Sequence, residues 1–155
     1  MIRRKLLSVP AVLASSAFIA APCSDTDFSG YLVLRSAAGY QHLYDGPLKF
    51  QMEAGVMLAR LEYAIMAVTR AEHVYIARFS EAAPSVHFHL FPRTQAIAAQ
   101  FLRENPDAEH GVNGPLLFDW ARRKYHVNQP EELSAATIAA AKEIRAALRT
   151  RKAAP

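Results

Sequence analysis

Apolar residues recur along this chain with two periods, and the change from one period to the other divides it into strands and helices. Residues 17–22 (AFIAAP) and 30–36 (GYLVLRS) are short and rich in apolar side chains, which predicts two strands joined by a loop. Between residues 48 and 69 apolar side chains recur three, four and seven positions apart without a proline, which predicts one long amphipathic helix. Residues 73–80 (HVYIARFS) and 85–93 (SVHFHLFPR) favour two more strands, and the short turn between them predicts an antiparallel pair.

The remainder of the chain is predicted to be mostly helical. A short helix is expected over residues 94–105 and another from Pro115 to Val127, with a loop between them. After Pro130, acidic residues precede an alanine-rich run that ends in cations, and this distribution matches the dipole of a helix. The order strand, strand, long helix, strand, strand and then helices predicts an α+β fold with a mostly antiparallel sheet.

Length and composition indicate one folded domain over residues 1–155. Hydrophobic residues make up 52% of the chain and charged residues 21%, which supplies enough apolar surface for a core. We expect that core over residues 17–93 and a C-terminal helical extension over residues 94–155. The net charge of +4 suits a phosphate-bearing ligand, although part of it lies in basic clusters at the two ends. Cys23 is the only cysteine, so an intrachain disulfide is excluded and an inert thiol is expected.

The first 23 residues (MIRRKLLSVPAVLASSAFIAAPC) allow two interpretations. A basic start, an apolar run and small residues are typical of a secretory signal, with Ser15 and Ala17 as a small-residue cleavage site. The alternative is a strand or short helix that enters the domain. The run is too short and too interrupted for a membrane span. We therefore expect a cytoplasmic protein with no membrane partner, and export is the alternative if the segment is a signal peptide.

The candidate catalytic side chains are concentrated in residues 85–93. Alternate residues of a strand face the same side, so Ser85, His87 and His89 are expected on one face, and the apolar residues between them on the face toward the core. One imidazole of such a pair can attack a phosphorus atom through a ring nitrogen. The other can donate a hydrogen bond to the oxygens of the phosphate as charge develops on them.

Two alternatives to catalysis remain open for these histidines. They can be exposed or hydrogen-bonded residues on an ordinary strand. They can also bind zinc, since His-x-His is a common ligand pair, but a third ligand is then needed. The other histidines, His42, His73, His110 and His126, or a carboxylate, would have to supply it.

The segment SVHFHLFPR resembles the signature of the histidine-triad (HIT) superfamily of nucleotide hydrolases and transferases, in which three histidines alternate with apolar residues, often before Pro-Arg. GYLVLRS is similar to an earlier strand of the same family, and the order of a helix and a strand before the triad also agrees. The resemblance implies a HIT-like fold and covers residues 17–93, with the remainder as a looser extension.

The resemblance also implies roles for single residues. His87 corresponds to the middle histidine, which is the nucleophile toward the α-phosphate, and His89 to the third, which contacts the phosphate. Ser85 stands at the position of the first histidine. The implied substrates are nucleoside phosphate esters, dinucleoside polyphosphates or phosphoramidates, hydrolysed through a nucleotidyl-histidine intermediate. A homodimer is implied, and no metal or other cofactor. Ser80 and Arg93 are the candidate phosphate-binding residues, with a solvated strand end as the alternative for Arg93.

The chain departs from the family pattern at further positions. The serine or threonine common five residues before the nucleophile is Ala82 here, and Ser80 can replace it only if the turn is shifted. The acidic residue that usually holds the ribose falls near Pro22, with Asp25 or Asp27 as substitutes. We therefore expect a weak or altered HIT-type enzyme. The alternatives are a degenerate nucleotide-binding or interaction module and an exported protein with a histidine-based metal site.

The basic segment DWARRKY, residues 119–125, is interpreted as an ordinary helix. Trp120 is expected to pack and its cations, Arg122 among them, to lie in water. No nucleic-acid motif accompanies them, so no nucleic-acid partner is expected.

Overall fold

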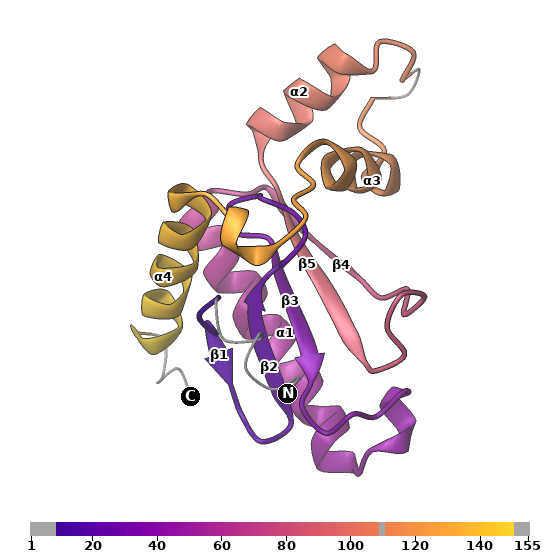
Figure 1. Ribbon diagram of the computed structural model, residues 1–155, viewed down its shortest axis with the longest axis vertical. Coiled ribbons are helices and arrows are strands. Elements are labelled where there is room, and N and C mark those ends of the chain that lie inside the picture. Colours follow the sequence, from indigo (N-terminus) through magenta and orange to yellow (C-terminus); the bar gives the residue numbers. More distant parts are fainter. Residues whose placement is uncertain (1–8, 109–110, 151–155) are drawn as a thin grey trace.

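Five strands form one antiparallel sheet with helices around it in the computed structural model, which describes residues 9–108 and 111–150 (Figure 1). The strand order is β1-β2-β3-β5-β4, and every neighbouring pair is antiparallel. The strands are β1 (Leu13–Ala14), β2 (Phe18–Pro22), β3 (Leu32–Ser36), β4 (His73–Ala77) and β5 (His87–Arg93). The α+β class, the antiparallel sheet and the pairing of β4 with β5 are as predicted.

Within the described residues, four α-helices accompany the sheet, with short 3₁₀ turns at Leu43–Asp45 and Pro130–Glu132. They are α1 (Leu48–Thr69), α2 (Gln95–Glu104), α3 (Gly114–Lys124) and α4 (Ala135–Thr150). The long helix α1 has the predicted bounds, because its apolar period continues over the whole segment between Pro47 and Arg70, which ends it in a left-handed conformation.

The strands β4 and β5 are shorter than predicted, and the connection between them is longer. β4 ends at Ala77 and β5 begins at His87. Ser85 therefore precedes the strand instead of lying within it. β1, a two-residue edge strand, was not predicted, since two residues are too few to carry a period.

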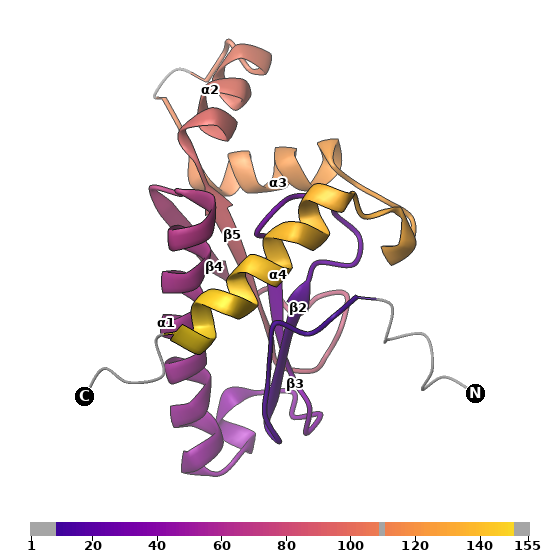
Figure 2. The same cartoon turned by 90° about the vertical axis from the view of Figure 1, so that its left-hand side faces the viewer.

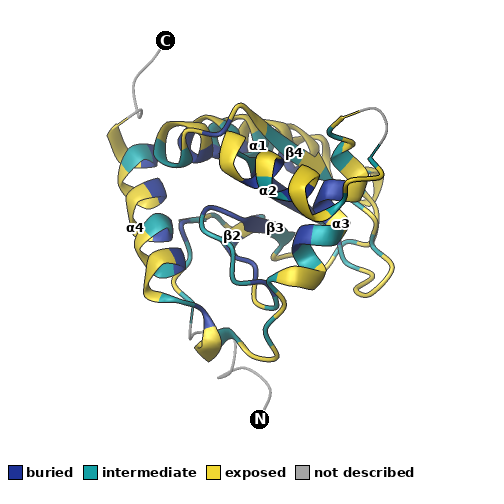
Figure 3. Cartoon of the chain, turned by 90° about the horizontal axis from the view of Figure 1, so that it is seen from above, coloured by how far each residue is buried: buried dark blue, intermediate teal, exposed yellow. Residues whose placement is uncertain are grey.

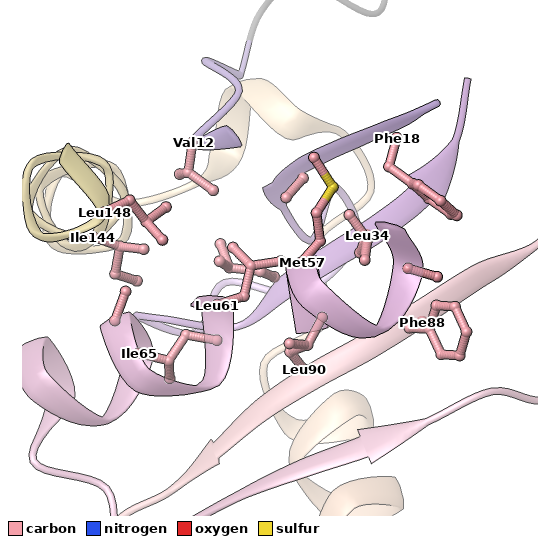
Figure 4. Packing of buried hydrophobic residues seen from close by; sticks show 14 of the residues in the cluster. Val12, Phe18, Leu34, Met57, Leu61, Ile65, Phe88, Leu90, Ile144 and Leu148 are labelled. Carbon is pink, nitrogen blue, oxygen red and sulfur yellow. The ribbon is translucent and has the colours of Figure 1, made fainter. Parts of the chain in front are cut away.

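One face of the sheet packs against α1 and α4 (Figure 2). Phe88 and Leu90 of β5 point into this main core together with Phe18 of β2, and Phe18 stacks on Phe50 of α1 at 4.6 Å between ring centroids (Figure 4). Ile144 and Leu148 bring α4 into the same cluster. Each such side chain contributes about 1.5–3 kcal/mol when it is fully buried.

The opposite face of β3 and β5 packs against α2 and α3 in a second apolar cluster. Val33 and Phe91 from the sheet meet Phe118 of α3 and Ile97 of α2 there. Seen from above, the buried surfaces of the helices turn toward the sheet (Figure 3). His89 lies on this second face and is only 9% exposed. The histidine face is thus partly covered by α3.

Hydrogen bonds at the two ends of α3 fix the helix and the loop after β2. The side chain of Asn113 accepts a hydrogen bond from the backbone N–H of Leu116 and caps the helix. At the other end, Thr26 and His126 form a β-bridge that ties the loop after β2 to the end of α3. The backbone N–H of Val127 donates to the carbonyl of Asp25 at 2.9 Å and completes the link.

The described part of the N-terminal segment belongs to the fold. Val12 and Phe18 are buried in the main core, and β2 is an interior strand. Residues 1–8, which include the basic start of the segment, lie outside the described residues. Among the described residues, no helix combines the length and the apolar character needed to cross a bilayer.

Candidate active site

A cavity of about 270 Å³ lies beside the N-terminal end of β5. We call it the histidine cavity; it is lined by Arg35, Ser80, Ser85, His87, His89 and Arg122, among others. Four segments therefore converge here: the loop after β2, β3, the β4–β5 connection with β5, and the last turn of α3. In the sheet register Arg35 pairs with His87 and Val33 with His89, which fixes one cation directly beside the candidate nucleophile.

His87 is held by its own backbone. Its Nδ1 lies 2.9 Å from the carbonyl oxygen of Ser85. A carbonyl oxygen only accepts, so the ring proton sits on Nδ1 and donates to it. In the neutral imidazole, Nε2 then carries the free lone pair. The ring is half-buried and lines the cavity, which gives the arrangement of a nucleophile.

His89 is held more tightly and is kept neutral. Its Nδ1 lies 2.7 Å from the hydroxyl of Tyr31, and its ring centroid lies 5.3 Å from that of His87. Burial, followed by the positive charge of Arg122 and the neighbouring His87, lowers the pKa of His89 to about 4. A neutral ring of this kind can donate one hydrogen bond to a phosphate but is not an acid near neutral pH.

The two serines also line the histidine cavity. Ser80 has a left-handed backbone with φ of 58°, and its buried hydroxyl oxygen has no hydrogen-bond partner among residues 9–108 and 111–150. A strained, unpartnered hydroxyl beside two imidazoles is typical of a functional position. Ala82 lines the cavity as well but has no polar group.

Arg93 is not brought to this site. Its guanidinium forms an ion pair with Glu72, and it is not among the residues that line the histidine cavity. His42 is likewise outside it, where it stacks on Tyr44 near the start of α1. The structure therefore gathers Ser80, Ser85, His87 and His89 and leaves Arg93 apart.

Two cations at the cavity, Arg35 and Arg122, were not among the candidate site residues drawn from the sequence. Asp25, which the sequence offered only as a ribose ligand, pairs with Arg122 at 3.1 Å. The expectation that Arg122 lies in water is wrong, because its side chain is only 35% exposed and its guanidinium lies over the ring of Phe118. A local signal for this was absent, since Arg122 and Asp25 are 97 residues apart.

The two candidate ribose ligands have other partners. Asp27 accepts hydrogen bonds from Ser134 and Thr137 at the start of α4, away from the histidines. Asp25 lines the histidine cavity, but its oxygens already accept from Cys23, Thr26 and Arg122. Both carboxylates therefore already accept hydrogen bonds within the protein, and of the two only Asp25 lines the histidine cavity.

A larger cavity of about 620 Å³ adjoins the histidine cavity. We call it the outer cavity. The two share Asp25, Phe79 and Arg122, which form the boundary between them. Phe79 is 62% exposed, and its ring stacks on that of Phe118 at 6.4 Å between centroids.

The metal alternative finds no ligand set in the described residues. Among residues 9–108 and 111–150, no group of three or more His, Cys, Asp or Glu side chains is placed to hold an ion. His110 lies outside these residues.

Comparison with solved structures identifies the fold. A hypothetical histidine triad nucleotide-binding protein from Sulfolobus tokodaii matches with a TM-score of 0.63 and 12% identity, over 97% of this chain and 91% of that one. A histidine triad protein from Marinobacter aquaeolei matches with a TM-score of 0.61 and 17% identity, over 96% of each chain. A HIT-like protein involved in cell-cycle regulation from Bartonella henselae gives a TM-score of 0.60 and 18% identity, over 93% of this chain and 90% of that one.

The class of the protein follows from these matches. The chain has the α+β fold of the histidine triad proteins, as the sequence resemblance implied. No protein-family model matches the sequence, and no curated protein matches it.

Proposed function

We propose that the protein binds a nucleoside phosphate ester in the histidine cavity and hydrolyses it through a nucleotidyl intermediate on His87. The observation that carries the proposal is the bond between Nδ1 of His87 and the carbonyl of Ser85. It fixes the tautomer in which Nε2 is the free nucleophile, and the ring lines a cavity that also contains two arginines. The structural neighbour from Sulfolobus tokodaii, named as a nucleotide-binding protein, supports the same class of ligand.

The reaction has two steps. In the first, Nε2 of His87 attacks the α-phosphorus, an N–P bond forms, and the bond to the leaving group breaks with its electron pair. In the second, water attacks the same phosphorus and releases a proton to solvent. The N–P bond then breaks, the imidazole is restored, and a nucleoside monophosphate leaves.

Several groups around His87 suit the charge that develops on the phosphate. Arg35 and Arg122 are permanent cations, and Ser80 and Ser85 are neutral donors. Two opposing charges also line the cavity: Glu81, which is exposed, and Asp25, which is paired with Arg122. Ser85 cannot act as an imidazole acid or base, so the activity is expected to be lower than in a site with three histidines.

The test compares His87→Ala with His73→Ala, a matched control on an exposed residue of β4 that does not line the cavity. Each protein is incubated with a dinucleoside polyphosphate and with an adenosine phosphoramidate. We expect His87→Ala to reduce turnover at least about a thousandfold, because the covalent route is lost, and His73→Ala to leave it unchanged. Mass spectrometry after an alkaline quench should find the nucleotidyl adduct on His87. Turnover that survives His87→Ala would refute the mechanism.

The degenerate-module alternative makes a different prediction for the same experiment. If neither substrate is turned over but a nucleoside monophosphate binds, and His87→Ala weakens that binding, the protein is a nucleotide-binding module. The low pKa of His89 and the packing of its ring against Phe118 fit either outcome.

We also propose a homodimer formed through α1 and the edge strand β4. Leu48, Met52, Val56 and Met66 are exposed on α1, and Ile76 is exposed on β4, which contacts α1. An apolar stripe of this length beside an open strand edge is typical of a covered surface. Light scattering should give a dimer that Val56→Glu dissociates, whereas Leu102→Glu, on exposed α2 surface, should leave it intact.

A cytoplasmic location is part of the proposal. Cleavage after Ala17 would remove β1 and Val12, a main-core residue, from the fold. The intact mass of the protein isolated from its native cell will show whether this segment is retained. A mass that corresponds to a chain beginning at Phe18 or Cys23 would favour export.

A further inference from the structure

The reaction proposed above uses Arg122 only as one of two cations near the reacting phosphate, but its position allows a more specific role. It lies at the boundary between the histidine cavity and the outer cavity and lines both. Asp25 and Phe79 are the other two residues that the cavities share. A group bound at Nε2 of His87 in one cavity would therefore have its neighbouring atoms directed past Arg122 into the other.

Asp25 holds Arg122 in this position. Its Oδ2 accepts from Nη2 of Arg122 at 3.1 Å, and its Oδ1 accepts from Cys23 at 3.1 Å and Thr26 at 2.8 Å. Burial opposes the ionisation of Asp25, but these hydrogen bonds and the charge of Arg122 outweigh it and keep the pKa of the carboxyl below its usual range. The carboxylate thus accepts three hydrogen bonds within the protein, and the one from Arg122 fixes the guanidinium.

Part of the guanidinium is left without an acceptor. Nε of Arg122 is buried and has no hydrogen-bond partner among residues 9–108 and 111–150. The central carbon of the guanidinium, Cζ of Arg122, lies 5.9 Å from the centre of the Phe118 ring, and this contact restrains the plane of the guanidinium. A buried donor on a cation is costly to leave unpaired, and a phosphate, like a carboxylate, matches the geometry of a guanidinium.

Among the described residues, the histidine cavity has no third histidine to act as an acid for a basic leaving group; His126 lines the outer cavity instead. An amine expelled from a phosphoramidate needs a proton as it leaves, whereas a phosphate expelled from an anhydride leaves as a stable anion. Ser85 stands where the family has its first histidine, and His89 is neutral and held by Tyr31. The histidine cavity is thus better suited to neutralise an anionic leaving group than to protonate a basic one.

We propose that Arg122, positioned by Asp25, binds an anionic phosphate leaving group at the boundary of the two cavities, so that this site cleaves nucleotidyl phosphoanhydrides in preference to phosphoramidates. The inference rests on the proposed attack by His87. When the N–P bond forms, the P–O bond breaks and its electron pair stays on the departing phosphate oxygen. Arg122 neutralises that charge, and no proton is required. The leaving group then occupies the outer cavity, where Asp119 is already paired with Arg123.

The experiment measures two quantities for wild type, Arg122→Gln, Arg122→Lys and the control Arg103→Gln, which removes an exposed cation from α2. One is kcat/KM for a dinucleoside polyphosphate and for an adenosine phosphoramidate. The other is the affinity for inorganic pyrophosphate, measured by calorimetry. We expect wild type to prefer the polyphosphate, and Arg122→Gln to lower that kcat/KM about a hundredfold while it affects the phosphoramidate less.

Pyrophosphate binding should weaken at least about tenfold in Arg122→Gln and by less in Arg122→Lys, which keeps the charge but loses the forked geometry. Arg103→Gln should match wild type in both measurements. Asp25→Asn tests the positioning role: it should lower kcat for the polyphosphate more than it raises KM, because the guanidinium remains but is no longer fixed. Thermal unfolding of each variant shows whether it is folded, and Arg122→Lys serves if Arg122→Gln is not.

Two results would overturn the inference: equal or better turnover of the phosphoramidate, or pyrophosphate affinity within twofold of wild type in folded Arg122→Gln. If wild type turns over neither substrate, the reaction proposed for His87 fails by itself. The pyrophosphate measurement then still decides whether Arg122 is the anion-binding residue.

Discussion

Nδ1 of His89 lies 2.7 Å from the hydroxyl oxygen of Tyr31, and this contact joins β5 to the residue before β3. Burial, followed by the nearby Cys23, raises the pKa of Tyr31, so its hydroxyl keeps its proton and can donate to His89. In that arrangement the proton of the neutral imidazole is on Nε2. Tyr31 thereby prepares His89 as a donor toward the histidine cavity.

Tyr31→Phe removes this hydrogen bond and leaves the buried Nδ1 of His89 without its partner. We expect the free energy of unfolding to fall by about 1–3 kcal/mol in urea denaturation, and the affinity for phosphate ligands to fall with it. Tyr75→Phe is the matched control, because the Tyr75 hydroxyl makes no hydrogen bond to the described residues. Equal stability of the two variants would contradict the prediction.

The buried, neutral state of His89 predicts a pH dependence of stability. Its pKa in the folded protein is about 4, against an ordinary value of 6.5. The unfolded chain therefore binds a proton between these values that the folded protein does not bind, and stability falls as the pH is lowered from 6.5 to 4. The contribution is at most about 3 kcal/mol. His89→Gln, which cannot titrate, should lose this part of the slope, and an unchanged slope would refute the assignment.

Ser80 combines backbone strain with a hydroxyl at the cavity, and two substitutions separate them. Ser80→Gly relieves the left-handed φ of 58° and should raise the free energy of unfolding by up to about 1 kcal/mol. Ser80→Ala keeps the strain. Both remove the hydroxyl and should lower turnover about tenfold or more. Arg70→Gly, at the other non-glycine residue of positive φ in the described part of the chain, should stabilise the protein without affecting turnover. Full activity of Ser80→Ala would exclude a role for the hydroxyl.

The parts of this structure that follow from the sequence are those with a long or regular pattern. The helix α1 has the predicted bounds because its apolar period continues for 22 residues. The alternation in β5 placed Phe88 and Leu90 in the main core and the two histidines on the other face, since a strand allows no other arrangement.

The parts that do not follow depend on contacts between distant segments. The cover over His89 comes from Phe118 of α3, and the ion pair at the cavity joins Asp25 to Arg122. On a helix whose last turn contains three consecutive cations, nothing local distinguishes Arg122, which lines the cavity, from the other two. The expectation of a cation in water is confirmed for Arg123, the residue after Arg122, which pairs with Asp119 on the surface.

Asp27 offers a test that separates stability from ligand binding. Its Oδ1 accepts from the backbone and hydroxyl of Ser134, each at 3.0 Å, and from Thr137 at 2.6 Å, which ties the loop after β2 to the start of α4. Asp27→Ala should therefore lower the free energy of unfolding by about 1–2 kcal/mol and leave KM for a nucleotide substrate unchanged in the folded protein. Asp107→Ala is the control, an exposed aspartate away from both cavities. A raised KM with unchanged stability would instead make Asp27 the ribose ligand.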